Sequence, residues 1–169
     1  KSALTKLLVR WSPCATPSDH HDGGHLRWPF SVLAYQLSER DIMSNDLIQR
    51  ICEELYAHRF NFNSEVQLHE GIMTVLSGAG IQFEHEKDLG DPNRVDFYCD
   101  DGAGSGVVIE VKIKGTVAEA LRQVNRYIHQ QSVSGVILAS SAPWGRRPLT
   151  SLPKWDGKPF ELLAIRRAL

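Results

Sequence analysis

The sequence has little cysteine, almost no net charge and no long apolar segment. Cys14, Cys52 and Cys99 are widely spaced and odd in number, which argues against a disulfide framework and favours a reducing compartment. Lys and Arg total 19 against 20 for Asp and Glu, a formal net charge of -1, so any basic patch for a nucleic acid must be local. No apolar run reaches the length of a membrane span, and the first residues lack the order of a secretory signal. We therefore expect a cytoplasmic protein that does not bind a membrane.

Length and composition predict one folded domain preceded by an irregular segment. With 169 residues, 42% of them hydrophobic, the chain can bury one sizeable core. Residues 11–30 mix Trp, Pro, His, Gly and Ser and follow neither helical nor strand periodicity. Met43 is then followed by Ser44, Asn45 and Asp46, which are good helix-capping types. We expect residues 1–42 to be an irregular or disordered extension and residues 43–169 to be the domain.

Hydrophobic periodicity in residues 43–169 changes between helical and strand patterns. Helices are expected at about 46–58, at 64–77, where Ser64 and Gln67 form a capping box, and after Thr116, which forms a second box with Glu119. Strand character is found in residues 81–88, 94–99, 107–113, 135–139 and 160–165. The second and third strands should form an antiparallel hairpin, and the helix after Thr116 should return the chain as a crossover. The expected class is α/β, with a mixed central sheet flanked by helices.

The alternation of side chains along the hairpin predicts which polar residues meet. On its first strand Val95 and Phe97 would share the apolar face, which leaves Asp96 on the opposite one. On its second strand Glu110 and Lys112 would lie opposite the β-branched apolar residues. Asp96, Glu110 and Lys112 are therefore expected to converge on one face of the sheet.

Two carboxylates and an amine in an apolar setting are costly unless a cation or a solvent cleft compensates them. Mg²⁺, or Mn²⁺ in its place, prefers oxygen ligands from one or two carboxylates and takes others from water and substrate phosphate. Asp96 and Glu110 would be a suitable half-site for such an ion. The chemistry implied is phosphodiester hydrolysis, in which Lys112 positions the attacking water or stabilises the developing negative charge.

Three stretches of the sequence resemble one known family. They are residues 94–97 (RVDF), 108–112 (VIEVK) and 120–127 (ALRQVNRY). Within residues 64 to about 139, their order resembles the PD-(D/E)xK nuclease superfamily, which has the restriction-endonuclease-like fold. The resemblance implies an αβββαβ core. Val95 stands where the family name has Pro.

The resemblance also implies roles for single residues. Asp96 and Glu110 would bind the metal, and Lys112 would assist the nucleophile. A Glu on the preceding helix often adds a metal ligand in this family, and here that residue would be Glu65. Gln123 matches a polar position that commonly supports the site.

Simpler interpretations stand beside these roles. Asp96 could form only a solvated cross-strand ion pair with Arg94 or Lys112, an arrangement that contributes little stability. Glu70 competes with Glu65 as the helix ligand, although Glu65 lies on the side of the helix that faces the core. Gln123 could equally be an ordinary surface residue.

Several residues near the expected cleft could contact a nucleic acid. Basic side chains there would bind phosphates, and the binding would depend on salt. The residues expected to do so are Lys114, Arg122, Arg126 and Tyr127. Trp144, Arg146 and Arg147 in the late loop could stack on or pair with nucleic acid, or simply cap the core.

The sequence thus predicts a metal-dependent nuclease that hydrolyses DNA. The alternative in another class is a nucleic-acid-binding or assembly module that keeps the fold but does not cut. An RNA-specific or branched-junction-specific nuclease is a third interpretation. A homodimer would let two sites reach both strands, although no residue pattern requires one.

Overall fold

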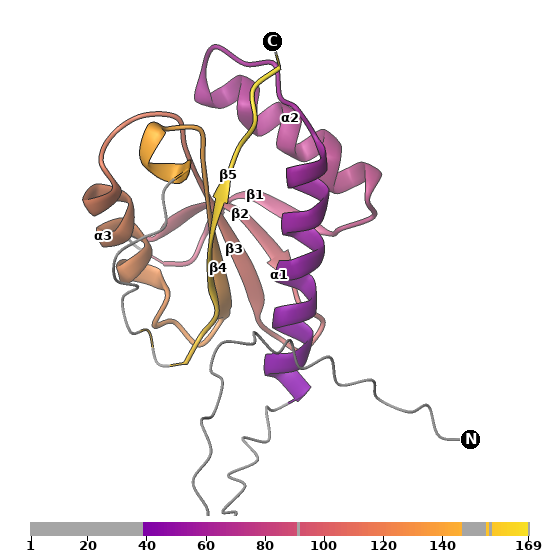
Figure 1. The fold of residues 1–169 in the computed structure, drawn as a ribbon. Coiled ribbons are helices and arrows are strands. Elements are labelled where there is room, and N and C mark those ends of the chain that lie inside the picture. Colours follow the sequence, from indigo (N-terminus) through magenta and orange to yellow (C-terminus); the bar gives the residue numbers. More distant parts are fainter. Residues whose placement is uncertain (1–38, 91, 147–154, 156, 169) are drawn as a thin grey trace, which may run out of the picture. The chain divides into compact units, whose positions relative to one another are not determined.

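The computed structural model describes residues 39–90, 92–146, 155 and 157–168, so most of the predicted extension lies outside the described residues. All of the described residues belong to the unit Tyr35–Leu169. Its elements, drawn in Figure 1, are α1 (Glu39–Ala57), α2 (Glu65–Gly78), β1 (Phe83–Asp88), β2 (Arg94–Asp100), β3 (Gly106–Lys112), α3 (Val117–Tyr127), β4 (Val133–Ser140), the 3-10 turn η1 (Pro143–Arg146) and β5 (Phe160–Ala164). No helix in this part of the chain is long and apolar enough to cross a membrane.

The five strands form one open mixed sheet in the order β1-β2-β3-β4-β5. β1, β2 and β3 pair antiparallel, whereas β3, β4 and β5 run parallel. The antiparallel hairpin and the helical crossover through α3 are as the sequence predicts. Because β3, β4 and β5 are parallel, their carboxyl ends all point to the same edge of the sheet.

Helices cover both faces of the sheet. In Figure 1, α1 and α2 lie on one side and α3 lies on the other. Ile51 of α1 and Ile72 of α2 pack with Phe97 and Ile109 on the first face. Val124 of α3 packs on the second face with the other core cluster. β3 is therefore buried on both faces, which explains its nearly continuous apolar sequence.

Helix α1 begins at Glu39, so the predicted start at residues 44–46 is wrong. Ser44 does not cap the helix. It is buried inside the helix, and its hydroxyl donates to Asp101 Oδ2 at 3.3 Å in the β2–β3 loop. A serine within a helix can satisfy its hydroxyl with a tertiary partner, which local capping rules do not detect. The helix passes through Met43, the residue at which the domain is predicted to begin.

The caps of α2 and α3 position the two helices that flank the site. Thr116 and Glu119 form the predicted capping box, with both side chains bonded to backbone amides. Ser64 accepts from the Gln67 amide as predicted, but the Gln67 side chain accepts from the Asn63 amide, one residue before the cap. Both helices start where the sequence places them, to within one residue.

Candidate active site

Strands β2 and β3 separate at the position of Asp96 and Glu110. Their pairing runs from Asp100 with Gly106 to Phe97 with Ile109, and the next pair in this register, Asp96 with Glu110, is not formed. The Asp96 carboxylate takes the place of a backbone partner, because its Oδ2 accepts from the Val111 amide at 2.7 Å. β3 continues beyond this point through its pairing with β4. An acidic side chain thus lies where two strands part.

The side-chain alternation of β2 is interrupted at the same point. Phe97 belongs to the core cluster beneath α1 and α2, whereas Val95 belongs to the cluster beneath α3. The prediction that Val95 and Phe97 share a face is therefore wrong. The cause lies at Asp96, whose backbone pairs with neither neighbouring strand. Glu86 lies opposite it on β1, and its φ of 52° is in the left-handed region.

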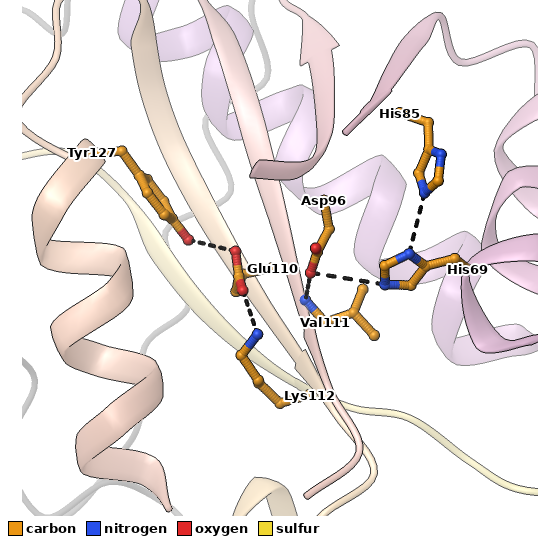
Figure 2. A network of polar contacts seen from close by, with 7 residues as sticks. All are labelled: His69, His85, Asp96, Glu110, Val111, Lys112 and Tyr127. Atoms are coloured by element: carbon orange, nitrogen blue, oxygen red, sulfur yellow. Dashed lines mark hydrogen bonds and ion pairs between the residues drawn. The ribbon is translucent and has the colours of Figure 1, made fainter. Parts of the chain in front are cut away.

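Glu110 is the most deeply buried acid of the site, with 0% of its surface exposed. Lys112 lies on the same face of β3, two residues along, and its Nζ donates to Glu110 Oε1 at 2.5 Å. The hydroxyl of Tyr127 on α3 donates to Glu110 Oε2 at 3.0 Å. Figure 2 shows both contacts. The carboxylate is held by one cation and one neutral donor.

Burial and the nearby charges shift the pKa of each group in the site. Burial, and next the charge of Asp96, raises the pKa of Glu110 to about 7, although Lys112 opposes this shift. The pKa of Asp96 is also raised, first by burial, against the lowering effect of the Val111 amide and of Lys112. Lys112 therefore offsets only part of the unfavourable burial and repulsion of the two carboxylates, and a second cation would stabilise their charged forms further. Such a carboxylate pair, next to a fixed amine, has the donor chemistry of a divalent-cation site.

His69 on α2 and His85 on β1 complete the polar network, and the sequence analysis missed both. His69 is 8% exposed, and its Nε2 lies 3.8 Å from Asp96 Oδ2 without a hydrogen-bond partner. Its Nδ1 lies 3.2 Å from His85 Nε2, and both rings pack against Phe97. In Figure 2, Asp96 lies between Glu110 and His69. One sequence signal was present, since His69 follows Glu65 by one turn on the buried side of α2.

The pKa of His69 is lowered, chiefly because burial disfavours the imidazolium. A neutral imidazole has one N–H and one lone pair. If Nδ1–H donates to His85, the Nε2 lone pair faces the Asp96 carboxylate. A metal-binding histidine is usually oriented in this way, with its second ring nitrogen donating to a fixed acceptor.

Of the two glutamates proposed as the helix ligand, Glu65 is the one close to the site. Its charge contributes to raising the pKa values of both Asp96 and Lys112. Glu70 instead lines a separate hollow with Gln67 and other polar residues. Within the described ranges, however, no three His, Cys, Asp or Glu side chains are gathered closely enough to hold a metal ion. Glu65 therefore does not close a three-ligand group in this conformation.

The other predicted residues divide between the site and the surface. Tyr127 is 1% exposed and bonded to Glu110, so it lies inside the polar network of the site. Gln123 is half-buried one turn before Tyr127. Arg122 and Arg126 line an open pocket on α3 with Trp155. Lys114 is exposed two residues after the end of β3.

Asp96 does not form the surface ion pair that was the simpler interpretation. Arg94 pairs with Glu86 at 2.7 Å, and Lys112 pairs with Glu110.

A comparison of the chain with known protein families, curated proteins and solved structures found no match.

Proposed function

We propose that the protein is a metal-dependent nuclease of the restriction-endonuclease-like fold that hydrolyses phosphodiester bonds in DNA. The observation that carries the proposal is the separation of β2 and β3 at two carboxylates, half-buried Asp96 and fully buried Glu110, with the Lys112 amine bonded to Glu110. Burying two acids beside each other is unfavourable in the metal-free protein, since the pKa of each is raised. Carboxylates whose pKa values are raised in this way are typical of functional sites, including those that bind a catalytic cation.

Asp96 and Glu110 would hold Mg²⁺ or Mn²⁺, two carboxylates being the usual number for Mg²⁺ in sites that also bind phosphate. The Nε2 of His69 is buried, has no hydrogen-bond partner and lies 3.8 Å from Asp96 Oδ2, so it would become a third donor if the site tightened around a bound ion. A nitrogen donor favours Mn²⁺ over Mg²⁺. The metal, when bound, would polarise the scissile phosphate and lower the pKa of a coordinated water.

The remaining groups would position the reactants. The Lys112 amine is partly exposed and anchored to Glu110, so it can orient the attacking water or stabilise charge on the phosphate oxygens. Burial and the charge of Glu110 raise the pKa of Tyr127 well above its usual value, so its hydroxyl stays protonated and holds the Glu110 carboxylate in place. Gln123, one turn earlier on α3, is available to orient water.

A second function, nucleic-acid binding without cleavage, is favoured by one observation. Lys112 and Glu110 neutralise each other, and the described residues hold no three-ligand group. In that case the polar network would only stabilise the fold. RNA or branched DNA as the substrate remains within the first proposal.

The two functions are separated by a cleavage assay with single-stranded, duplex and branched DNA, and with RNA, in Mg²⁺, Mn²⁺ or EDTA. We expect cleavage that requires the metal and that falls by roughly 10²–10³-fold in Lys112→Ala, the range for loss of one donor that stabilises developing charge. Asp96→Asn should abolish it. Asp46→Asn, an exposed Asp of α1, is the matched control and should cleave normally. Cleavage that survives in EDTA or in Asp96→Asn would contradict the proposal.

A further inference from the structure

Four arginines from three separate parts of the chain line one pocket. Arg59 follows α1, Arg146 ends η1, and Arg166 and Arg167 follow β5. Together with Tyr56 they surround a volume of about 490 Å³. The arginines are spread over more than a hundred positions of the sequence, so only the fold brings them together.

Among the residues that the structure describes, no acidic side chain lines this arginine pocket. Within the described part of the chain, none of the four guanidinium groups lies within ion-pair distance of a carboxylate. The whole sequence has a formal net charge of -1, so this concentration of positive charge is local. Arg166 also has a buried Nε without a hydrogen-bond partner. Like charges gathered without counter-charges favour the binding of an anion.

Two of the guanidinium groups are held in place before any ligand binds. Arg166 stacks on the Tyr56 ring at 4.3 Å and donates to the Tyr56 carbonyl. Arg167 stacks on the Phe62 ring at 4.5 Å and donates to the Phe62 carbonyl at 2.7 Å. A guanidinium has five N–H donors, so each keeps donors for a phosphate, and stacking lowers the entropic cost of using them.

The arginine pocket lies at the same edge of the sheet as the candidate active site. Lys112 is level with Ser140 of β4, and Ser140 is level with Ala164 of β5, which lines the pocket. Two strand spacings separate Lys112 from Ala164, about 10 Å. The turn η1 connects the two regions, because Trp144 donates to the Gly115 carbonyl at 2.9 Å, just beyond β3. In Figure 1, η1 and the end of β5 lie at this edge.

We infer that the arginine pocket binds the backbone phosphates of the nucleic-acid strand whose scissile bond lies at Asp96, Glu110 and Lys112. This inference rests on the proposed nuclease function and adds to it the path of the substrate. A distance of about 10 Å corresponds to about three nucleotides of a stacked strand. The phosphates in the pocket would therefore belong to the strand that enters the site, a few nucleotides from the bond that is cut.

The test measures binding alone, by the fluorescence anisotropy of a labelled single-stranded oligodeoxynucleotide in EDTA. The variant is the double substitution Arg59→Gln with Arg146→Gln, two side chains at the surface of the pocket. The control is Lys87→Gln with Arg94→Gln, which removes the same charge from β1 and β2, the two strands on the far side of β3 from β5. Circular dichroism melts of both variants verify that they are folded.

Each lost phosphate contact on a single strand makes the slope of log K against log salt less negative by about 0.7. Loss of two contacts should therefore make the slope less negative by about 1.4 and weaken binding about 25-fold at 0.1 M salt. The double substitution Arg59→Lys with Arg146→Lys keeps the charge and should restore most of the affinity. The control variant should bind like the wild type.

The inference is overturned if the pocket variant and the control variant bind the strand equally well. It is also overturned if inorganic phosphate alone raises the melting temperature through Arg59 and Arg146 while strand binding does not depend on them, since the ligand is then a small phosphate compound. Because the assay contains no metal, its outcome is independent of cleavage. Metal-dependent cleavage that is unchanged in the pocket variant counts against the pocket alone, whereas strand binding at the pocket without any cleavage counts against the nuclease function alone.

Discussion

Replacement of Glu110 by Gln should stabilise the metal-free protein at alkaline pH. The ordinary pKa of the carboxyl is 4.5, and burial followed by the charge of Asp96 raises it to about 7 in the folded state. Folding therefore takes up a proton between these values. Above about pH 7 the folded state must keep a buried charge, and below about pH 4.5 both states are protonated and the cost disappears.

The size of the effect follows from that difference. At about 1.36 kcal/mol for each pH unit, the raised pKa corresponds to about 3 kcal/mol of lost stability at pH 8. Gln has nearly the same shape, but only its carbonyl oxygen can accept. With that oxygen toward Lys112, its NH2 group donates to the Tyr127 hydroxyl, and the charge-assisted bond to Lys112 becomes weaker. We expect Glu110→Gln to be more stable than the wild type by roughly 1–3 kcal/mol at pH 8 in EDTA. The difference should approach zero below pH 4.5.

Urea unfolding at pH 8 and at pH 4.5 measures this difference. Glu70→Gln, an exposed Glu of α2, is the matched control and should change little at either pH. Mg²⁺ or Mn²⁺ should stabilise the wild type by mass action and should not stabilise Glu110→Gln. The argument that Glu110 is an unfavourable buried charge would be refuted by either of two results. The variant could be less stable than the wild type at pH 8, or its free energy of unfolding could differ from that of the wild type by the same amount at both pH values.

Three further outcomes follow from the contacts of the site and its helices. His85→Phe should weaken Mn²⁺ binding by roughly 10–100-fold in calorimetry without nucleic acid, because His69 loses the partner that orients its ring; unchanged affinity would remove His69 from the metal site. Tyr127→Phe should lower the free energy of unfolding by roughly 1.5–3 kcal/mol, the value of a hydrogen bond to a charged group, and an effect near zero would mean that the bond to Glu110 contributes nothing. Thr116→Ala should cost about 1 kcal/mol in urea unfolding through loss of the capping box, with Thr74→Ala on the exposed side of α2 as the comparison.

The local elements could be predicted because their signals lie within a few residues. Thr116 and Glu119 are three positions apart, and both bonds of their box form inside one turn. The strand patterns likewise reflect burial that repeats every second residue, and the observed strands agree with them to within two residues. Glu110 and Lys112 share a face of β3 because the pleat requires it, whatever the remainder of the fold.

Errors arose where a side chain has a distant partner. Ser44 has the local appearance of a cap, but it bonds with Asp101 across 57 positions. Val95 departs from the simple alternation because Asp96 leaves the ladder to accept a bond from Val111 of the neighbouring strand. Neither partner can be inferred from residues nearby in the sequence.

The sequence by itself determined the order of helices and strands, the mixed pairing expected of them and the pair Glu110 and Lys112, since each depends on short-range periodicity. Only the tertiary structure decided that His69 reaches Asp96 and that four distant arginines line one pocket. The physical reason is the same in both cases. Burial and Coulomb energies depend on distance in space, and in this fold those distances are set by how helices α1 and α2 pack on the sheet and by the shared edge of its parallel strands.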